Sequence, residues 1–157
     1  MRVGIGYDIH RLKKGRKLLL GGVHVPYDSG CLGHSDGDVL IHAIVDAVLG
    51  AAGAGDIGAF FPDKDTRFKD ADSRHFLREL QAVLTKKKLK IVNIDAVVIA
   101  ERPSMASHKK KMCIAIAKEL GIAPVYVNVK AKTNEGLGPV GQGAAIACYA
   151  VASLKGK

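Results

Sequence analysis

The fold is decided by the stretch Gly33-His34-Ser35-Asp36-Gly37-Asp38-Val39-Leu40-Ile41-His42. Positions 43–51 after it are apolar except for one acidic residue, and a helix that is apolar nearly all round is a buried one. Ser35 or Asp36 is suited to cap this helix, because both side chains accept hydrogen bonds from free backbone N–H groups. The sequence therefore predicts a buried helix that runs to about Ala51.

Three polar residues recur every four positions in this apolar segment and share one stripe of the helix: Asp38, His42 and Asp46. Burying carboxylates beside an imidazole is costly unless they are paired, hydrogen-bonded or bound to a metal. One interpretation is a capped helix with a satisfied core histidine, and the other is a functional site. The helix by itself leaves both open.

A candidate metal site follows when the N-terminal segment is considered. Residues 2–12 read as a strand, on which Asp8 and His10 are two apart and point to the same face. Together with His42 they offer two imidazoles and one carboxylate, a set typical of catalytic zinc with a fourth position left for substrate or water.

A second candidate metal ligand lies far along the chain. Glu135 stands beside Lys132 and Thr133, and a carboxylate among such donors suits Mg²⁺ or Mn²⁺ shared with phosphate oxygens. The residues thus predict a metal-dependent enzyme that acts on a phosphorylated small molecule.

The rest of the chain alternates strands and helices. Three boundaries are clear from single residues. A strand ends at Pro26, a helix begins after Asp72 or Ser73, and a second helix ends at Gly121. The expected strands are 17–20, 23–25, 91–100, 125–131 and 144–154, and the expected later helices are 73–86 and about 105–120. The apolar tail 144–154 fits a helix or a strand, and we favour a strand because a hairpin with 125–131 would complete the sheet. Residues 50–65 read as a long functional loop.

Composition indicates one domain over residues 1–157, with 48% hydrophobic and 25% charged residues. The longest apolar run, around 39–55, is interrupted by His42 and Asp46, so no membrane span is expected. The cysteines are odd in number, widely spaced and without a Cys-x-x-Cys pair: Cys31, Cys113 and Cys148. These features, and the lack of a signal-peptide core, predict a cytoplasmic protein with reduced thiols.

The formal net charge of +9 favours anionic partners. It is gathered in three clusters that suit solvated turns and helix ends: Lys13, Lys14, Arg16 and Lys17; Lys86, Lys87, Lys88 and Lys90; Lys109, Lys110 and Lys111. A nucleic-acid-binding module is one alternative. The chain has four Phe, four Tyr and no Trp, which supplies a base-stacking platform poorly. A zinc-dependent phosphohydrolase acting on a nucleotide-linked substrate is the other alternative.

Five separated motifs occur in order: Gly6-Tyr7-Asp8-Ile9-His10, Gly33 to Asp38 with His42, Gly55-Asp56-Ile57-Gly58, Phe61-Pro62-Asp63, and Lys130-Ala131-Lys132-Thr133-Asn134-Glu135. Over essentially its full length the chain resembles the 2-C-methyl-D-erythritol 2,4-cyclodiphosphate synthase family of the non-mevalonate isoprenoid pathway. The resemblance implies a two-layer α/β sandwich with a mixed sheet, assembled as a homotrimer with active sites between subunits.

The implied reaction is that of a phosphorus–oxygen lyase. The 2-phosphate of 4-diphosphocytidyl-2-C-methyl-D-erythritol 2-phosphate attacks the β-phosphorus, CMP leaves, and a cyclic diphosphate forms. Zinc would be held by Asp8, His10 and His42, and Mg²⁺ or Mn²⁺ by Glu135. No nucleic-acid or membrane partner is implied.

The resemblance also assigns roles to other residues. His34 and Thr133 match positions that stabilise the transition state, while Asp38 and Asp46 are expected to support the site, with Asp38 holding a histidine in its ligating tautomer. The residues expected to contact substrate are Asp8, His10, His34, Ser35, Asp56, Ile57, Gly58, Phe61, Asp63, Asp65, Ala100, Pro103, Met105, Ala106, Ala131, Lys132, Thr133, Asn134 and Glu135.

Two departures limit the resemblance. Ser104 stands where the family usually has Lys in its cytidine loop, so no contact is carried over to that position. Near the trimer axis, where the family often has Arg, Glu and Phe, this chain has Gln142, Ala144 and Pro139. Because Gln supplies no fixed positive charge, we expect weak or absent binding of an isoprenoid diphosphate in the central cavity.

Overall fold

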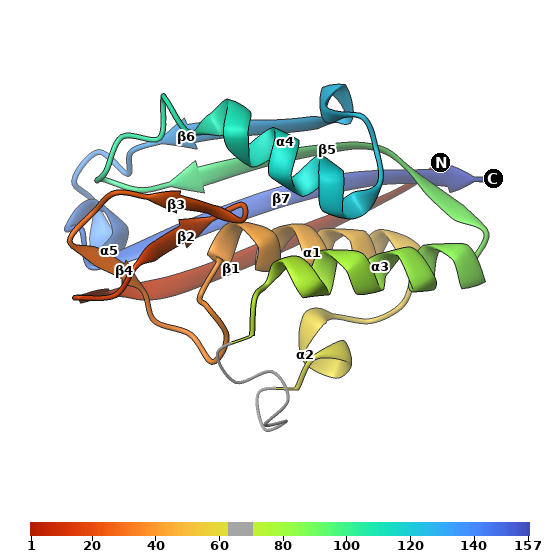
Figure 1. Cartoon of the computed structure of the whole chain (residues 1–157), viewed down its shortest axis with the longest axis horizontal. Coiled ribbons are helices and arrows are strands. Elements are labelled where there is room, and N and C mark those ends of the chain that lie inside the picture. Colours follow the sequence, from red (N-terminus) through yellow and green to blue (C-terminus); the bar gives the residue numbers. More distant parts are fainter. Residues whose placement is uncertain (63–70) are drawn as a thin grey trace.

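A five-stranded mixed sheet is the frame of the molecule in the computed structural model, which describes residues 1–62 and 71–157 (Figure 1). The strand order is β4-β1-β7-β5-β6, with β5 and β6 parallel and the other neighbours antiparallel. The strands are β1 (Arg2–Lys14), β4 (Ser29–Cys31), β5 (Leu89–Ile99), β6 (Val127–Lys132) and β7 (Ala145–Gly156). Between β1 and β4, β2 (Leu18–Leu20) and β3 (Val23–Val25) form a separate hairpin.

Strand β7 corrects the expected topology, because the predicted hairpin between 125–131 and 144–154 is wrong. β7 lies between β1 and β5 instead, in register from Arg2 opposite Leu154 to Arg11 opposite Ala145. β6 follows β5 through a helical crossover, which makes the two strands parallel neighbours. A long central strand forms backbone ladders on both sides, whereas a hairpin with the six-residue β6 would leave one side of β7 unpaired.

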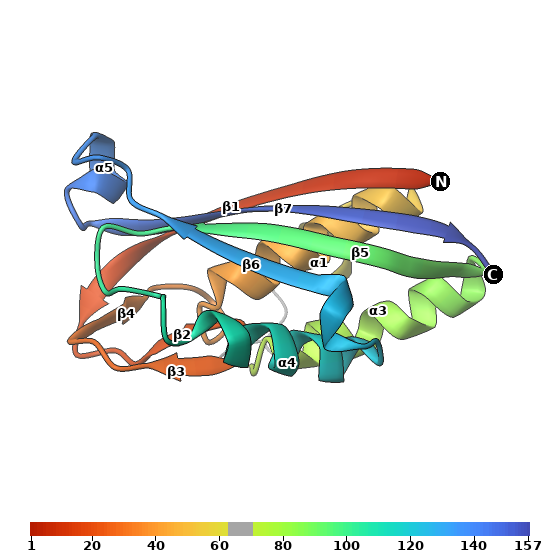
Figure 2. The same cartoon turned by 90° about the horizontal axis from the view of Figure 1, so that it is seen from above.

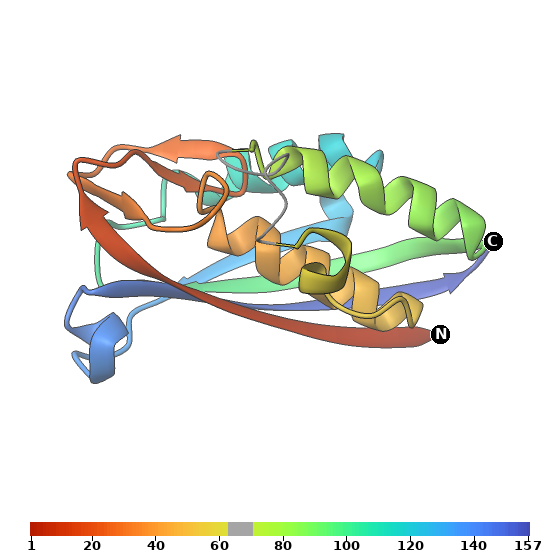
Figure 3. The ribbon, with the colours of Figure 1, turned by 90° about the horizontal axis from the view of Figure 1, so that it is seen from below.

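Three helices cover one face of this sheet, α1 (Val39–Ala52), α3 (Arg74–Lys86) and α4 (Lys109–Leu120) (Figures 2 and 3). The single turn α2 (Ile57–Phe60) follows α1, and Pro124–Tyr126 forms a 3₁₀ turn. The short α5 (Gly138–Gly141) lies on the opposite side of the sheet, at one end of the strands (Figures 2 and 3). The predicted buried helix is confirmed, since every residue of α1 except Asp46 and Gly50 is buried. Gly121 ends α4 in the left-handed conformation, as expected. No helix among the described residues is long and apolar enough to cross a bilayer.

Two glycines of β1 bring the strand and α1 together. A methyl group at Gly4 would lie 2.1 Å from the carbonyl oxygen of Ala47, and one at Gly6 would lie 2.0 Å from that of Ala43. The even-numbered side of β1 therefore faces α1, and by the two-residue period Asp8 and His10 face it too. This close approach places both side chains against the first turn of α1, where His42 lies.

On the other face of the sheet, the part formed by β1 and β7 is apolar and open to solvent in the described chain. Its odd-numbered β1 residues and its β7 partners are exposed although they are large and apolar: Val3 65%, Ile5 67%, Tyr7 47%, Ile9 42%, Tyr149 44% and Val151 41% exposed. The rings of Tyr7 and Tyr149 contact each other across the two strands. An apolar patch of this extent usually marks an interaction surface.

Candidate active site

Asp8, His10 and His42 converge at the junction of β1 and α1, as predicted. Asp8 Oδ2 lies 2.8 Å from His10 Nε2 and 3.0 Å from His42 Nδ1, and the two nitrogens are 3.2 Å apart. Tetrahedral zinc with bonds of about 2.0–2.1 Å places its ligand atoms about 3.3 Å apart. One oxygen and two nitrogens at nearly this spacing are a donor set that fits zinc.

The ligand atoms are oriented by contacts on their far sides. His10 Nδ1 lies 2.6 Å from the carbonyl oxygen of Leu32, to which it donates, so that Nε2 keeps its lone pair for a metal. Asp8 Oδ1 accepts a bond from the N–H of Ile9 at 2.9 Å, which leaves Oδ2 toward the histidines. The site is thus arranged by backbone groups of β1 and the loop that follows β4.

The charges of the cluster support each other. Burial opposes ionisation of Asp8, but its hydrogen-bonding and charge interactions with the two histidines outweigh burial and hold the pKa of the carboxyl well below its ordinary value. Burial also disfavours protonated His10, yet its bond to Asp8 and the carboxylate charge raise the pKa of the imidazole. A carboxylate that stays ionised is ready to bind a cation.

Asp38 corrects two predictions. It is the N-cap of α1, in place of Ser35 or Asp36, and it accepts bonds from the backbone N–H groups of Ile41, Gly21 and Gly22 at 3.0, 2.9 and 2.7 Å. It holds no histidine, because its carboxylate is taken up by these donors. Burial raises the pKa of Asp38, and the N–H donors oppose that rise. Asp38 ties the β2–β3 turn to the start of α1.

Replacing Asp38 by Ala removes this cap and leaves three N–H groups without their acceptor, two of them buried and one partly buried. We expect the free energy of unfolding to fall by about 3 kcal/mol. Urea denaturation at one fixed protein concentration measures it, with Asp28→Ala at an exposed loop position as the control. A loss below about 0.5 kcal/mol, the usual size of a surface change, would contradict the assigned role.

Asp46 and Asp56 position the loop after α1. Asp46 Oδ1 accepts from the N–H of Ile57 at 3.2 Å, and Asp56 caps α2 by accepting from the N–H of Ala59 at 2.8 Å. Asp46 therefore holds the segment that carries Gly58, and its role in the reaction stays a prediction. Residues 50–62 are partly helical, because α2 forms a single turn there.

A cavity of about 390 Å³ opens onto the metal-ligand cluster. Its lining contains most of the residues predicted near the substrate on this side of the molecule: Asp8, His10, His34, Ser35, Ile57, Gly58 and Phe61. Tyr7, Gly33, Asp46 and Phe76 also line it. Asp63 and Asp65 lie outside the described residues.

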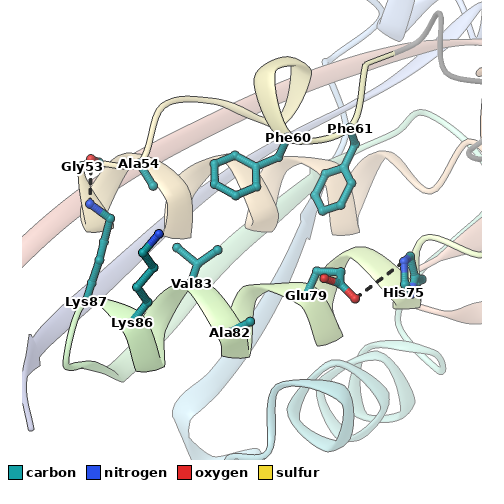
Figure 4. A pocket seen from close by; sticks show the side chains of 10 residues that line it. All are labelled: Gly53, Ala54, Phe60, Phe61, His75, Glu79, Ala82, Val83, Lys86 and Lys87. Atoms are coloured by element: carbon teal, nitrogen blue, oxygen red, sulfur yellow. Dashed lines mark hydrogen bonds and ion pairs between the residues drawn. The ribbon is translucent and has the colours of Figure 1, made fainter.

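A larger hollow of about 1060 Å³ lies next to this cavity, between α3 and the segment that follows α1 (Figure 4). Phe61 lines both spaces, and Lys86 and Lys87 stand at the far end of the larger one. The His75–Glu79 pair is the other charged feature that lines it. The convergent metal ligands lie in the smaller cavity, so the candidate chemistry is there.

The second predicted group gathers at the ends of β5 and β6. Thr133 Oγ1 donates to Glu135 Oε1 at 3.1 Å, and the N–H of Asn134 donates to Glu101 Oε2 at 3.2 Å. Ala100 donates its N–H to the carbonyl of Lys132, which brings the loop after β5 to this site. In that loop Met105 is buried, and Ser104 Oγ accepts from the N–H of Ala106. Pro103 and Ala131 lie in the same two segments.

Within one chain the two groups do not meet. Asp8 pairs with Cys148, Cys148 with Val98, and Val98 with Ala131, so three strand spacings separate the metal ligands from the end of β6. At about 4.8 Å each, this amounts to about 14 Å. The structure thus brings the residues of each group together and does not join the two groups in one cavity.

Sequence reasoning missed Ser73 as a site residue. It was expected to cap α3, but its side chain caps no helix N–H and lies fully buried beside His42, with Ser73 Oγ 3.0 Å from His42 Nε2. No sequence signal separates such a serine from an ordinary helix cap, since both precede an amphipathic helix. Ser35 also reaches His42 Nε2, at 3.1 Å.

The chain was compared with protein-family models, with curated sequences and with solved structures. Residues 1–155 match the model of the YgbB family. The chain is 55% identical over 154 residues to the 2-C-methyl-D-erythritol 2,4-cyclodiphosphate synthase of Alkaliphilus oremlandii, covering 98% of both chains. It is 53% identical to that of Geobacter sulfurreducens, covering 100% of both. A Plasmodium falciparum structure described as IspF in complex with CDP superposes with a TM-score of 0.87 at 40% identity, covering 99% of this chain and 96% of that one. The chain belongs to the YgbB family.

Proposed function

We propose that this protein is a 2-C-methyl-D-erythritol 2,4-cyclodiphosphate synthase. It converts 4-diphosphocytidyl-2-C-methyl-D-erythritol 2-phosphate into the cyclic diphosphate and releases CMP, in isoprenoid precursor biosynthesis. The observation that carries the proposal is the convergence of Asp8, His10 and His42 at one cavity, in a chain 55% identical to a synthase of that name.

The cation sites follow from the donor sets. Asp8, His10 and His42 would hold zinc, and Glu135 would hold Mg²⁺ or Mn²⁺, because two imidazoles with a carboxylate suit zinc and an exposed carboxylate beside a hydroxyl suits a hard cation. Bound there, the ions supply Lewis-acid polarisation and charge neutralisation to the phosphate groups. Ionised Asp8 prepares its site, since its pKa is held low by the two histidines.

The chain's own residues then position the substrate. An oxygen of the 2-phosphate forms a bond to the β-phosphorus, and the bond from that phosphorus to the oxygen of the CMP phosphate breaks. No protein nucleophile is needed. Catalysis therefore rests on holding the attacking 2-phosphate oxygen and the leaving CMP oxygen in line on either side of the β-phosphorus. His34 and Ser35 at the smaller cavity face the attacking side, and Thr133 faces the side that leaves.

The erythritol and cytidine contacts divide between the two clusters. Asp56, Ile57 and Gly58 meet the erythritol and ribose region, with Phe61 as a wall of the cavity. Residues 100–106 and 131–134 line the cytidine pocket and read the base largely through backbone groups, which suits a loop without a lysine at Ser104.

The protein works as a homotrimer with each active site between two subunits. Two observations support this assembly: the open apolar face of β1 and β7, and the separation of the metal-ligand cluster from Thr133 and Glu135 within one chain. A neighbouring copy that packs on the sheet face covers the apolar residues and brings its own β6 end to the first chain's cavity. A cytoplasmic location fits the three unpaired cysteines.

The reaction is tested by product analysis. The purified protein, supplied with zinc and Mg²⁺, is expected to convert the cytidine-linked substrate into CMP and cyclic diphosphate in equal amounts, measured by ³¹P NMR. A zinc phosphohydrolase would instead give CMP and an open-chain 2,4-bisphosphate with two separate phosphate groups, and that product would contradict the proposal. A nucleic-acid-binding module would show salt-sensitive binding and no turnover.

A further inference from the structure

His42 has a second ring nitrogen, Nε2, which faces away from the metal-ligand cluster. It points into a buried pocket formed by two serines, with Ser73 Oγ at 3.0 Å and Ser35 Oγ at 3.1 Å. Ser73 is 0% exposed and Ser35 is 5% exposed. Because this side of the ring is buried, these hydroxyls are the partners of Nε2, while Asp8 and His10 face Nδ1.

The direction of the Ser73 hydroxyl is set by Asp36. Ser73 Oγ donates to Asp36 Oδ1 at 2.5 Å, and the backbone N–H of Ser73 donates to Asp36 Oδ2 at 3.0 Å. The N–H of Asp38 also donates to Asp36 Oδ1, which holds the carboxylate at the start of α1. An ionised carboxylate only accepts, so the single proton of the Ser73 hydroxyl is committed to Asp36. The hydroxyl can then only accept from His42.

Ser35 does not set a direction in this way. Its Oγ lies 3.4 Å from Ser73 Oγ and 3.4 Å from the N–H of Gly37, and within the described part of the chain it has no carboxylate partner. Its hydroxyl proton is therefore free to turn. The chain Asp36–Ser73–His42 is the one with a fixed donor order.

We propose that Asp36 and Ser73 are positioning residues that hold His42 with its proton on Nε2 and its Nδ1 lone pair toward Asp8 and His10. This inference rests on the proposed metal role of His42. The two imidazoles are then held in the same way, each by an acceptor on the ring nitrogen that faces away from the metal-ligand cluster. For His10 this acceptor is the Leu32 carbonyl, and for His42 it is the Ser73 hydroxyl that Asp36 orients. Partners of this kind commonly change metal affinity by 10–100-fold when they are lost.

The ring proton of His42 is the first test, and its readout is not activity. In protein labelled with ¹⁵N-histidine and saturated with Zn²⁺, long-range ¹H–¹⁵N spectra are expected to show His42 protonated at Nε2, with the Nε2–H proton shifted downfield by its hydrogen bond to Ser73. Asp36→Asn keeps the size of the side chain but has one acceptor and one donor group, so it lets the Ser73 proton turn toward Nε2. We expect the Nε2–H proton of this variant to move upfield and to exchange faster with water. An unchanged Nε2–H signal would overturn the proposal.

The second test is the affinity for Co²⁺, measured by competition with a chromophoric chelator. Ser73→Ala and Asp36→Asn are expected to weaken binding about 10–100-fold. The matched control is Asp72→Asn, since Asp72 precedes Ser73 but pairs with Arg74 at the surface, and it is expected to change affinity less than about twofold.

The outcomes separate the two claims. If wild-type protein binds Co²⁺ and both variants bind it equally well, the positioning role is overturned while the proposed function stands. If wild-type protein binds no Co²⁺, the metal role and this proposal both fail. Thermal unfolding of each metal-free variant checks folding, and the isosteric Asp36→Asn carries the test should Ser73→Ala not fold.

Discussion

Asp8→Ala and His42→Ala are each expected to lower the rate of CMP release by about 10³-fold. A Lewis-acid metal contributes several kcal/mol to a transition state, and each 1.4 kcal/mol is a factor of ten in rate. Removing one of three protein ligands also leaves the remaining two too few for a stable site. The zinc content of each variant, measured by atomic absorption, is therefore expected to fall together with activity.

The controls for this prediction lie on the same chain. Asp28→Ala and His24→Ala change the same residue types at exposed positions and are expected to keep full activity and zinc. The result against the account would be an Asp8→Ala or His42→Ala protein that folds, lacks zinc and still turns over at more than about a tenth of the wild-type rate. Metal would then be unnecessary for the reaction.

A mixture of two inactive variants is expected to regain activity. Asp8→Ala destroys the zinc half of a site, and Glu135→Gln destroys the half at the end of β6. If each site takes one half from each of two neighbouring subunits, a random equal mixture forms intact sites at about one quarter of its interfaces, because the subunit with a good zinc half must sit beside one with a good β6 end. Co-expressed subunits should therefore show about a quarter of wild-type activity.

Pairing two variants of the same half provides the control. Asp8→Ala mixed with His42→Ala contains no subunit with an intact zinc half, so this mixture is expected to stay inactive. Failure of the first mixture to exceed its parents, when mixed assemblies are demonstrated by two different tags, would mean that both halves come from one chain. The separation of the clusters across β7, β5 and β6 argues against that outcome.

Much of the fold follows from local patterns in the sequence. The apolar run after Val39 predicts α1, Gly121 predicts the end of α4, and alternating residues predict β1, and all three are present. The pairing of β7 could not be predicted, because an apolar strand after a Gly-rich turn fits a hairpin as well as a central position. Only the competition among all strands for partners places it between β1 and β5.

The site residues that lie close through sequence spacing could be predicted. The contacts that depend on how distant elements pack together could not. Asp8 and His10 share a face of one strand, so their meeting with His42 follows once β1 packs on α1. The bonds that Asp38 accepts from Gly21 and Gly22 could not be predicted, because no sequence spacing reveals the approach of that turn to the start of α1. The contacts of Ser73 depend in the same way on how α3 packs.

The central claim is that a phosphate of the substrate, and not water, attacks the β-phosphorus. Turnover in H₂¹⁸O, followed by mass spectrometry of both products, tests this most directly. Neither CMP nor the cyclic diphosphate is expected to acquire ¹⁸O, because no water enters the new bond. One ¹⁸O atom in the products for each CMP released would show hydrolysis and contradict it.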